Sequence, residues 1–158
     1  MPRLPTLALL LLPLPAFADM AFKASDLLPN PDTALAGALV ACATGVTDPD
    51  AADAAFLGAG WEKTEGEGSW EYGQGDLSVM MWNVPGFCMV DAPDISTDAM
   101  ATTFLGLANI PPGGARDADG CRTFALDPNI TVTLNGPGND PVCTSDTGAA
   151  MRFFLAPS

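Results

Sequence analysis

The stretch Ile130-Thr131-Val132-Thr133-Leu134-Asn135 alternates apolar and polar side chains without a break. Successive side chains of a β-strand point to opposite faces, so the pattern predicts a strand with one buried and one solvated face. Sheets of such strands are typically antiparallel, and their buried face must be covered by other elements. The stretch therefore favours an antiparallel sheet that helices cover on one side.

Strand patterns recur before and after this stretch. In residues 77–82, Leu77, Val79 and Met81 alternate with Ser78, Met80 and Trp82. Clusters of Gly, Pro, Asn and Asp separate the strand-like segments from one another, as turns require. Further short strands are expected at residues 61–63, 70–72, 87–90, 122–126 and 151–155.

Three segments carry apolar residues at helical spacing: residues 32–43, 48–57 and 96–108. Asp48 followed by Pro49 is a typical helix start, and Ser96 can cap the third helix. The expected order is two helices, about three strands, one helix and about three strands. This order, ααβββαβββ, predicts an α+β fold with an antiparallel sheet of about five to six strands and three helices.

The first residues have the pattern of a secretory signal peptide. Arg3 precedes an apolar run over residues 4–14, and Ala16-Phe17-Ala18 fits a cleavage site. A membrane anchor is the alternative, but the run is shorter than the about 20 apolar residues that span a bilayer. We expect a cleaved signal at 1–18, a flexible lead-in at 19–31 and a single domain at 32–158. The protein would be periplasmic or secreted, without membrane insertion after cleavage.

Four cysteines follow the expected signal: Cys42, Cys88, Cys121 and Cys143. An even number of cysteines in an exported chain indicates disulfides. We expect the pairs Cys42–Cys88 and Cys121–Cys143, because each joins near neighbours within one half of the predicted element order. A zinc site of four thiolates is the alternative, but the chain lacks the C-x-x-C pairs typical of one.

The composition excludes several classes of protein. The chain has no histidine, which removes Ser-His-Asp triads, Cys-His dyads and His-ligated metals. Six basic residues against nineteen acidic ones give a net charge of −13, which argues against a nucleic-acid partner. Loss of Arg3 with the signal would make the balance one unit more negative. Because 48% of the residues are apolar, the chain is not expected to be disordered.

Two acidic motifs are candidates for chemical sites. Asp117-Ala118-Asp119-Gly120 resembles the start of a calcium loop but lacks the later EF-hand ligands, so Asp117, Asp119 and Asp140 are weak calcium candidates and no metal is expected. Asp146-Thr147-Gly148-Ala149 resembles the catalytic loop of retroviral-type aspartic proteases. That chemistry needs two such loops, so a polar turn before the last strand is expected here instead.

Aromatic residues are concentrated in one β segment: Trp61, Trp70, Tyr72 and Trp82. They are candidates for a surface on which a sugar or a peptide stacks. Packing in the core is the competing interpretation, since large aromatic side chains dominate cores as well as interfaces.

We therefore expect a non-enzymatic binding or accessory domain with no catalytic residues, no cofactor and an unknown ligand. One alternative is an inhibitor of a cationic cell-wall hydrolase, because a strongly acidic domain is steered toward a basic protein. Acidity that serves only solubility is the competing explanation for the charge. A second alternative is a hydrolase that uses a carboxylate pair, such as Asp91 with Asp94 or Glu62 with Glu71.

Overall fold

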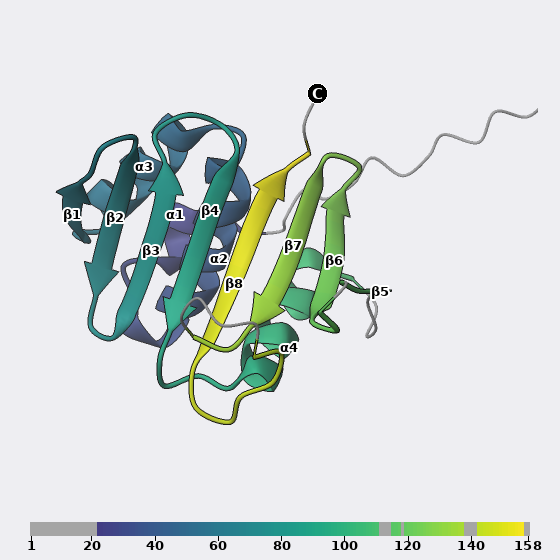
Figure 1. Ribbon diagram of the computed structural model, residues 1–158. Helices are drawn as coiled ribbons and strands as arrows, with labels where there is room; N and C mark the ends of the chain where they lie inside the picture. The colour runs from purple at the N-terminus through teal and green to yellow at the C-terminus, as the bar shows by residue number, and fades with distance from the viewer. Residues whose placement is uncertain (1–21, 111–114, 118, 138–141, 157–158) are drawn as a thin grey trace, which may run out of the picture.

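The computed structural model describes residues 22–110, 115–117, 119–137 and 142–156. Its strands form one antiparallel sheet in the order β1-β2-β3-β4-β8-β7-β6-β5. Figure 1 shows the last strand in the middle of the sheet, between two meanders. The strands are β1 (Glu62–Glu65), β2 (Ser69–Gln74), β3 (Leu77–Trp82), β4 (Phe87–Ala92), β5 (Ala115–Arg116), β6 (Arg122–Asp127), β7 (Ile130–Asn135) and β8 (Ala149–Leu155).

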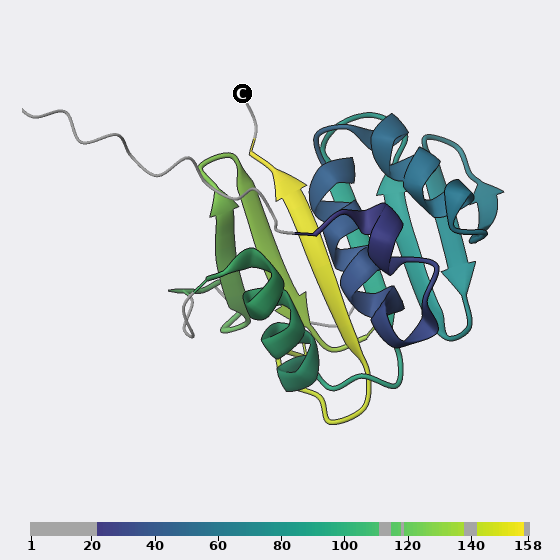
Figure 2. The same ribbon diagram turned by 180° about the vertical axis from the view of Figure 1, so that it is seen from behind.

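The helices lie together on one face of this sheet, as the view from behind in Figure 2 shows. Asn30, Asp48 and Ser96 accept backbone N–H bonds at the starts of η1, α3 and α4 respectively, which satisfies donors that a helix start leaves free. The helices are α1 (Ala24–Leu27), the single 3-10 turn η1 (Pro31–Thr33), α2 (Ala34–Gly45), α3 (Pro49–Gly58) and α4 (Thr97–Ala108).

The core lies between the helices and the sheet. Phe104 of α4 packs its ring against Phe124 of β6 and Phe153 of β8, with centroids 5.6 and 5.8 Å apart. Ile130, Val132 and Leu134 of the alternating stretch are all buried, which confirms the predicted inward face of β7.

The fold class is confirmed, and both disulfides form the predicted pairs, Cys42–Cys88 and Cys121–Cys143. The element counts differ: the described residues hold eight strands, of which β5 has only two residues, and four α-helices. The strand that no expected segment covers is β5, which is too short for alternation of side chains to reveal it. The additional helix, α1, has four residues, too few for apolar spacing to reveal it.

Part of the segment expected to be a flexible lead-in is packed against the helices. Leu28 is fully buried, and the indole N–H of Trp61 donates to its carbonyl oxygen at 3.5 Å. A Cβ on Gly37 of α2 would lie only 2.7 Å from the backbone nitrogen of Leu28. The segment around Leu28 can therefore pack this closely on α2 only because residue 37 is a glycine. The structure thus differs from the expected lead-in over residues 24–31. The signal peptide at 1–18 lies outside the described residues.

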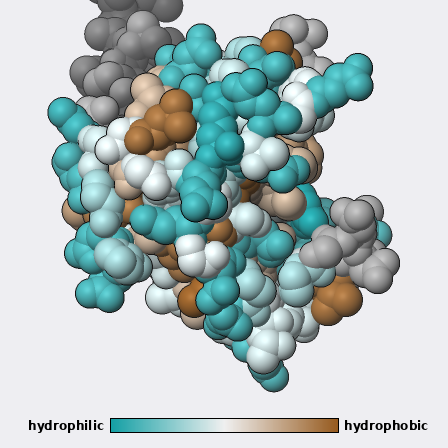
Figure 3. Space-filling view, turned by 90° about the vertical axis from the view of Figure 1, so that its left-hand side faces the viewer, coloured by the Kyte–Doolittle hydropathy of each residue, from teal (hydrophilic) through white to brown (hydrophobic). Residues whose placement is uncertain are grey.

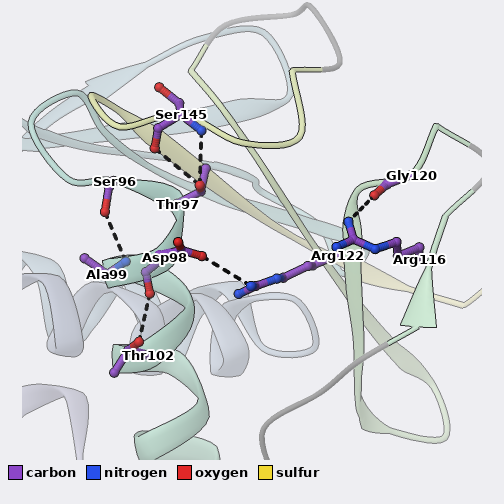
Figure 4. Close-up of polar contacts among 9 residues, drawn as sticks. All are labelled: Ser96, Thr97, Asp98, Ala99, Thr102, Arg116, Gly120, Arg122 and Ser145. Carbon is purple, nitrogen blue, oxygen red and sulfur yellow. Dashed lines mark hydrogen bonds and ion pairs between the residues drawn. The ribbon is translucent and has the colours of Figure 1, made fainter.

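The start of α4 holds the loop that precedes β8 (Figure 4). Thr97 is a buried polar residue; its backbone N–H donates to the Ser145 carbonyl at 3.0 Å, and its hydroxyl accepts from the Ser145 N–H at 3.1 Å. Asp98 forms an ion pair with Arg122 of β6 at 3.2 Å. The two hydrogen bonds of Thr97 hold the loop around Asp146, whose own side chain is exposed. They match the expected polar turn.

Candidate functional site

The sheet face opposite the helices, called the open face below, carries a row of aromatic side chains at one end. Within the described residues no helix packs on it. Strand alternation places Trp82 of β3, Phe87 of β4 and Phe154 of β8 on this face, because their neighbours Met81, Cys88 and Phe153 are buried on the helix side. We call Trp82, Phe87 and Phe154 the aromatic platform.

The three rings of the aromatic platform form one continuous surface. The centroids of Trp82 and Phe87 lie 5.5 Å apart, and those of Phe87 and Phe154 lie 5.3 Å apart. Trp82 is 47% exposed and Phe154 is 40% exposed, while Phe87 between them is nearly covered. Val84, in the turn after Trp82, is 56% exposed. Burying exposed aromatic area of this kind is a main source of affinity in protein interfaces.

The Trp82 ring packs directly on the backbone of Gly86. Gly86 has φ of +147°, and a Cβ there would lie 2.9 Å from two ring carbons of Trp82. The Gly86 backbone is held from both sides: its N–H donates to Val46 at 2.9 Å, and its carbonyl accepts from Leu155 at 2.9 Å. Because the ring packs on a fixed backbone, the Trp82 side chain loses little conformational entropy when a partner covers it.

Replacing Gly86 by alanine will displace the indole of Trp82 and destabilise the turn by about 1–3 kcal/mol, because the residue has positive φ and no room for a Cβ. Urea unfolding and acrylamide quenching of tryptophan fluorescence measure the two effects. Gly58→Ala serves as the control, since nothing lies within 4 Å of a Cβ there. Equal stability and equal quenching of the Gly86→Ala and Gly58→Ala variants would contradict the packing of Trp82 on Gly86.

Away from the platform, the open face carries three carboxylates and one guanidinium. Glu62, Glu71 and Asp91 point to it by strand alternation, and Arg152, in the middle of the face, donates to the side chain of Asn135 on β7. One carboxylate oxygen of Asp91 is buried without a hydrogen-bond partner among the described residues. The surface toward β1 is also mainly hydrophilic (Figure 3), which protects the edge of the sheet from pairing with other chains.

The structure separates the four aromatic residues that the sequence grouped. Trp61 and Tyr72 are buried on the helix side, where both contact the ring of Phe56 at centroid distances of 5.0 and 4.5 Å. Trp70 is half-buried on the same side, and the ammonium of Lys63 lies 4.0 Å from its ring centroid. Trp82 alone of the four reaches the open face.

A polar cluster joins α3 to the edge of the sheet. Tyr72 donates its hydroxyl proton to Asp53 at 2.5 Å, and Lys63 forms ion pairs with Asp53 at 2.9 Å and Glu65 at 3.3 Å. Burial of the Tyr72 hydroxyl and the adjacent Asp53 carboxylate raise its pKa above the ordinary value of 10.0. Burial lowers the pKa of the Lys63 ammonium, but the carboxylates of Asp53 and Glu65 raise it by more. The pKa of Lys63 is therefore raised overall. Neither group is activated as a nucleophile, so the cluster is structural.

The calcium candidates do not form a described metal site. Asp117 uses one carboxylate oxygen to accept the backbone N–H groups of Asp119 at 3.0 Å and Cys121 at 2.8 Å, which is a typical turn interaction. Asp140 lies outside the described residues. Across the part of the chain that the structure describes, no group of three His, Cys, Asp or Glu side chains is close enough to hold a metal ion.

The two carboxylate pairs that the sequence suggested lie in different surroundings. Glu62 lies on the edge strand β1 and Glu71 on its neighbour β2, and both side chains are exposed. Asp91 points to the open face, whereas Asp94 is exposed in the loop before α4. Neither of these two pairs is enclosed, because each includes an exposed carboxylate.

Sequence reasoning missed Phe87 and Phe154 as members of the surface. Phe154 follows the buried Phe153, and the residue names alone do not show which of two adjacent phenylalanines points outward. The sequence did contain one indication that Phe87 lies beside Trp82. Only four residues separate the two, and a tight hairpin brings its flanking residues together.

Comparison with protein-family models, with curated proteins and with solved structures finds no match to this chain. In the part of the chain that the structure describes, no helix has the length and apolar character needed to cross a membrane. The two disulfides are compatible with an extracellular or periplasmic location.

Proposed function

We propose that this protein is a non-enzymatic binding domain, exported to the periplasm or beyond, that holds a basic protein against its open face. The observation that carries the proposal is the aromatic platform: two half-exposed rings and the covered Phe87 form one apolar surface. Large exposed aromatic groups on a fixed backbone are typical anchors of protein interfaces.

The geometry of the rings favours a protein partner over a glycan. Trp82 is tilted by 41° to Phe87, and Phe87 by 53° to Phe154, so the rings do not offer parallel faces for successive sugars. They instead give a continuous, uneven apolar patch that suits the side chains of a protein.

Charge complementarity sets the chemistry of the partner. The chain has a net charge of −13, and Glu62, Glu71 and Asp91 lie on the same face as the platform. Such a field raises the rate of association with basic proteins and opposes acidic ones. A cationic cell-wall hydrolase of the lysozyme type belongs to this class of partner and serves as the probe.

Replacing Trp82 by alanine will weaken the complex with a lysozyme-type hydrolase about thirtyfold, the effect of losing about 2 kcal/mol at an interface anchor. Calorimetric titration at low and at about 0.15 M salt measures it, and higher salt will weaken the wild-type complex. Leu57→Ala is the matched control, because Leu57 is 49% exposed but lies on α3, on the helix side. Absence of binding at low salt, or equal losses for both variants, would overturn the proposal.

A further inference from the structure

The methionines of the chain divide into two groups. Five of the seven lie in the described residues. Met81, Met100 and Met151 are fully buried in the core, whereas Met80 on β3 and Met89 on β4 are partly exposed. All four cysteines are in disulfides, so the sulfur groups that an oxidant meets here are thioethers rather than thiols. Met80 and Met89 are the described methionines that solvent reaches.

Met80 and Met89 are cross-strand partners on the neighbouring strands β3 and β4 (Figure 1). Residues directly opposite each other place their Cβ atoms about 4.5–5.5 Å apart. The chain neighbours of both methionines are buried on the helix side, so strand alternation directs both thioethers to the open face.

The methionine pair continues the aromatic platform. Met80 lies two residues before Trp82 on β3, and Met89 lies two residues after Phe87 on β4. Two residues of a strand span about 7 Å, so the pair forms a second apolar row directly beside the rings. A partner that covers the platform will therefore also cover this row.

Oxidation of a thioether by hydrogen peroxide needs no further reactant. The sulfur lone pair attacks one peroxide oxygen, so that a sulfur–oxygen bond forms and the oxygen–oxygen bond breaks. The sulfur is oxidised by two electrons, and the second oxygen leaves as water after it takes the proton of the transferred oxygen. The resulting sulfoxide is polar and disrupts the apolar contacts that methionine makes at interfaces.

We propose that Met80 and Met89 form an oxidation site at which a peroxide weakens the binding of a basic protein to the open face. The effect on binding rests on the proposed function, because it concerns the same surface. Two sulfoxides beside the platform place polar oxygens where a partner excludes water, and burying a polar group without a hydrogen bond is costly. The fold persists after oxidation, because neither side chain belongs to the buried core.

Peptide mass spectrometry after brief treatment of the intact protein with hydrogen peroxide locates the modification. Met80 and Met89 will each gain one oxygen at least about tenfold faster than the three buried methionines, which an oxidant reaches only when the core opens. The circular dichroism spectrum will not change. Equal rates at the pair and at the buried methionines, or a pair that stays unoxidised, would overturn the proposal.

Calorimetric titration with a lysozyme-type hydrolase, after removal of the peroxide, measures the effect on binding. The doubly oxidised protein will bind at least about tenfold more weakly than the untreated protein. Equal affinities would overturn this inference and leave the proposed function standing. Absence of binding by the untreated protein at low salt would overturn the proposed function and the effect on binding with it, while the mass spectra still decide whether the pair is the oxidation site.

Variants assign the effect to the pair. Met80→Leu with Met89→Leu keeps apolar side chains of similar volume, and the affinity of this variant will be the same before and after peroxide. Met100→Leu is the matched control: Met100 is fully buried on α4, so peroxide will weaken this variant as it weakens the wild type. Met80→Gln with Met89→Gln will weaken the complex about tenfold without peroxide, because it places polar amides at the same positions. A peroxide effect of wild-type size in the double leucine variant would overturn the proposal.

Discussion

Joint replacement of Cys42 and Cys88 by alanine will lower the free energy of unfolding by about 4 kcal/mol. The disulfide closes 46 residues, and restriction of the unfolded chain by a loop of that length gives this value on the chain-entropy relation. Both cysteines are fully buried, and they tie α2 to β4 in the centre of the sheet. A loss of this size is a large share of the stability of a small domain.

Urea unfolding followed by circular dichroism measures the loss. The second disulfide is the comparison: Cys121–Cys143 closes 22 residues, so its joint replacement will cost about 3 kcal/mol. Its bridge lies outside the contact between the helices and the sheet centre, and the fold will persist without it. A cost below about 1 kcal/mol for the Cys42–Cys88 variant would contradict the central role of that bridge.

Stability will fall steeply as the pH rises above about 10, because of Tyr72. The folded state raises the pKa of this hydroxyl above its ordinary value of 10.0, so it holds the proton more tightly than the unfolded state does. The stabilisation is therefore complete below pH 10 and is lost as the pH rises toward the folded pKa. The slope reaches about 1.4 kcal/mol per pH unit.

Tyr72 is the single tyrosine of the chain, so absorbance of the phenolate reports on this group alone. We expect it to ionise only together with unfolding. Tyr72→Phe will remove most of the pH dependence and, near neutral pH, cost about 1–2 kcal/mol for the lost hydrogen bond to Asp53. The raised pKa of Lys63 leaves a smaller dependence above 10.5 in that variant. Ionisation of Tyr72 near pH 10 in the folded protein would contradict this account.

Local patterns predicted much of the fold. Strand alternation at residues 130–135 and the Asp48-Pro49 helix start placed β7 and α3 correctly, because both depend on near neighbours in the chain. The disulfide pairs followed from proximity in the element order. The position of β8 between β4 and β7 could not be predicted from the sequence, because strand order depends on contacts between residues far apart in the chain.

The candidate site was harder to predict than the fold. Strand alternation alone separates Trp82 from Tyr72, but it does not say which of the two faces the helices cover. That choice depends on α2 and α4, which pack on Cys88 and Phe153 and leave Trp82 outside. The packing of the Trp82 indole on Gly86 could not be predicted either, because it depends on the positive φ of Gly86 in the folded hairpin.

The indole N–H signals of the three tryptophans give the most direct test of the open face as the binding surface. In a ¹⁵N-labelled sample titrated with a lysozyme-type hydrolase, the Trp82 signal will shift or broaden. The signals of Trp61, whose N–H donates to Leu28 in the core, and of Trp70, covered by Lys63, will stay in place. A complex that forms while the Trp82 signal is unchanged would contradict the proposed function.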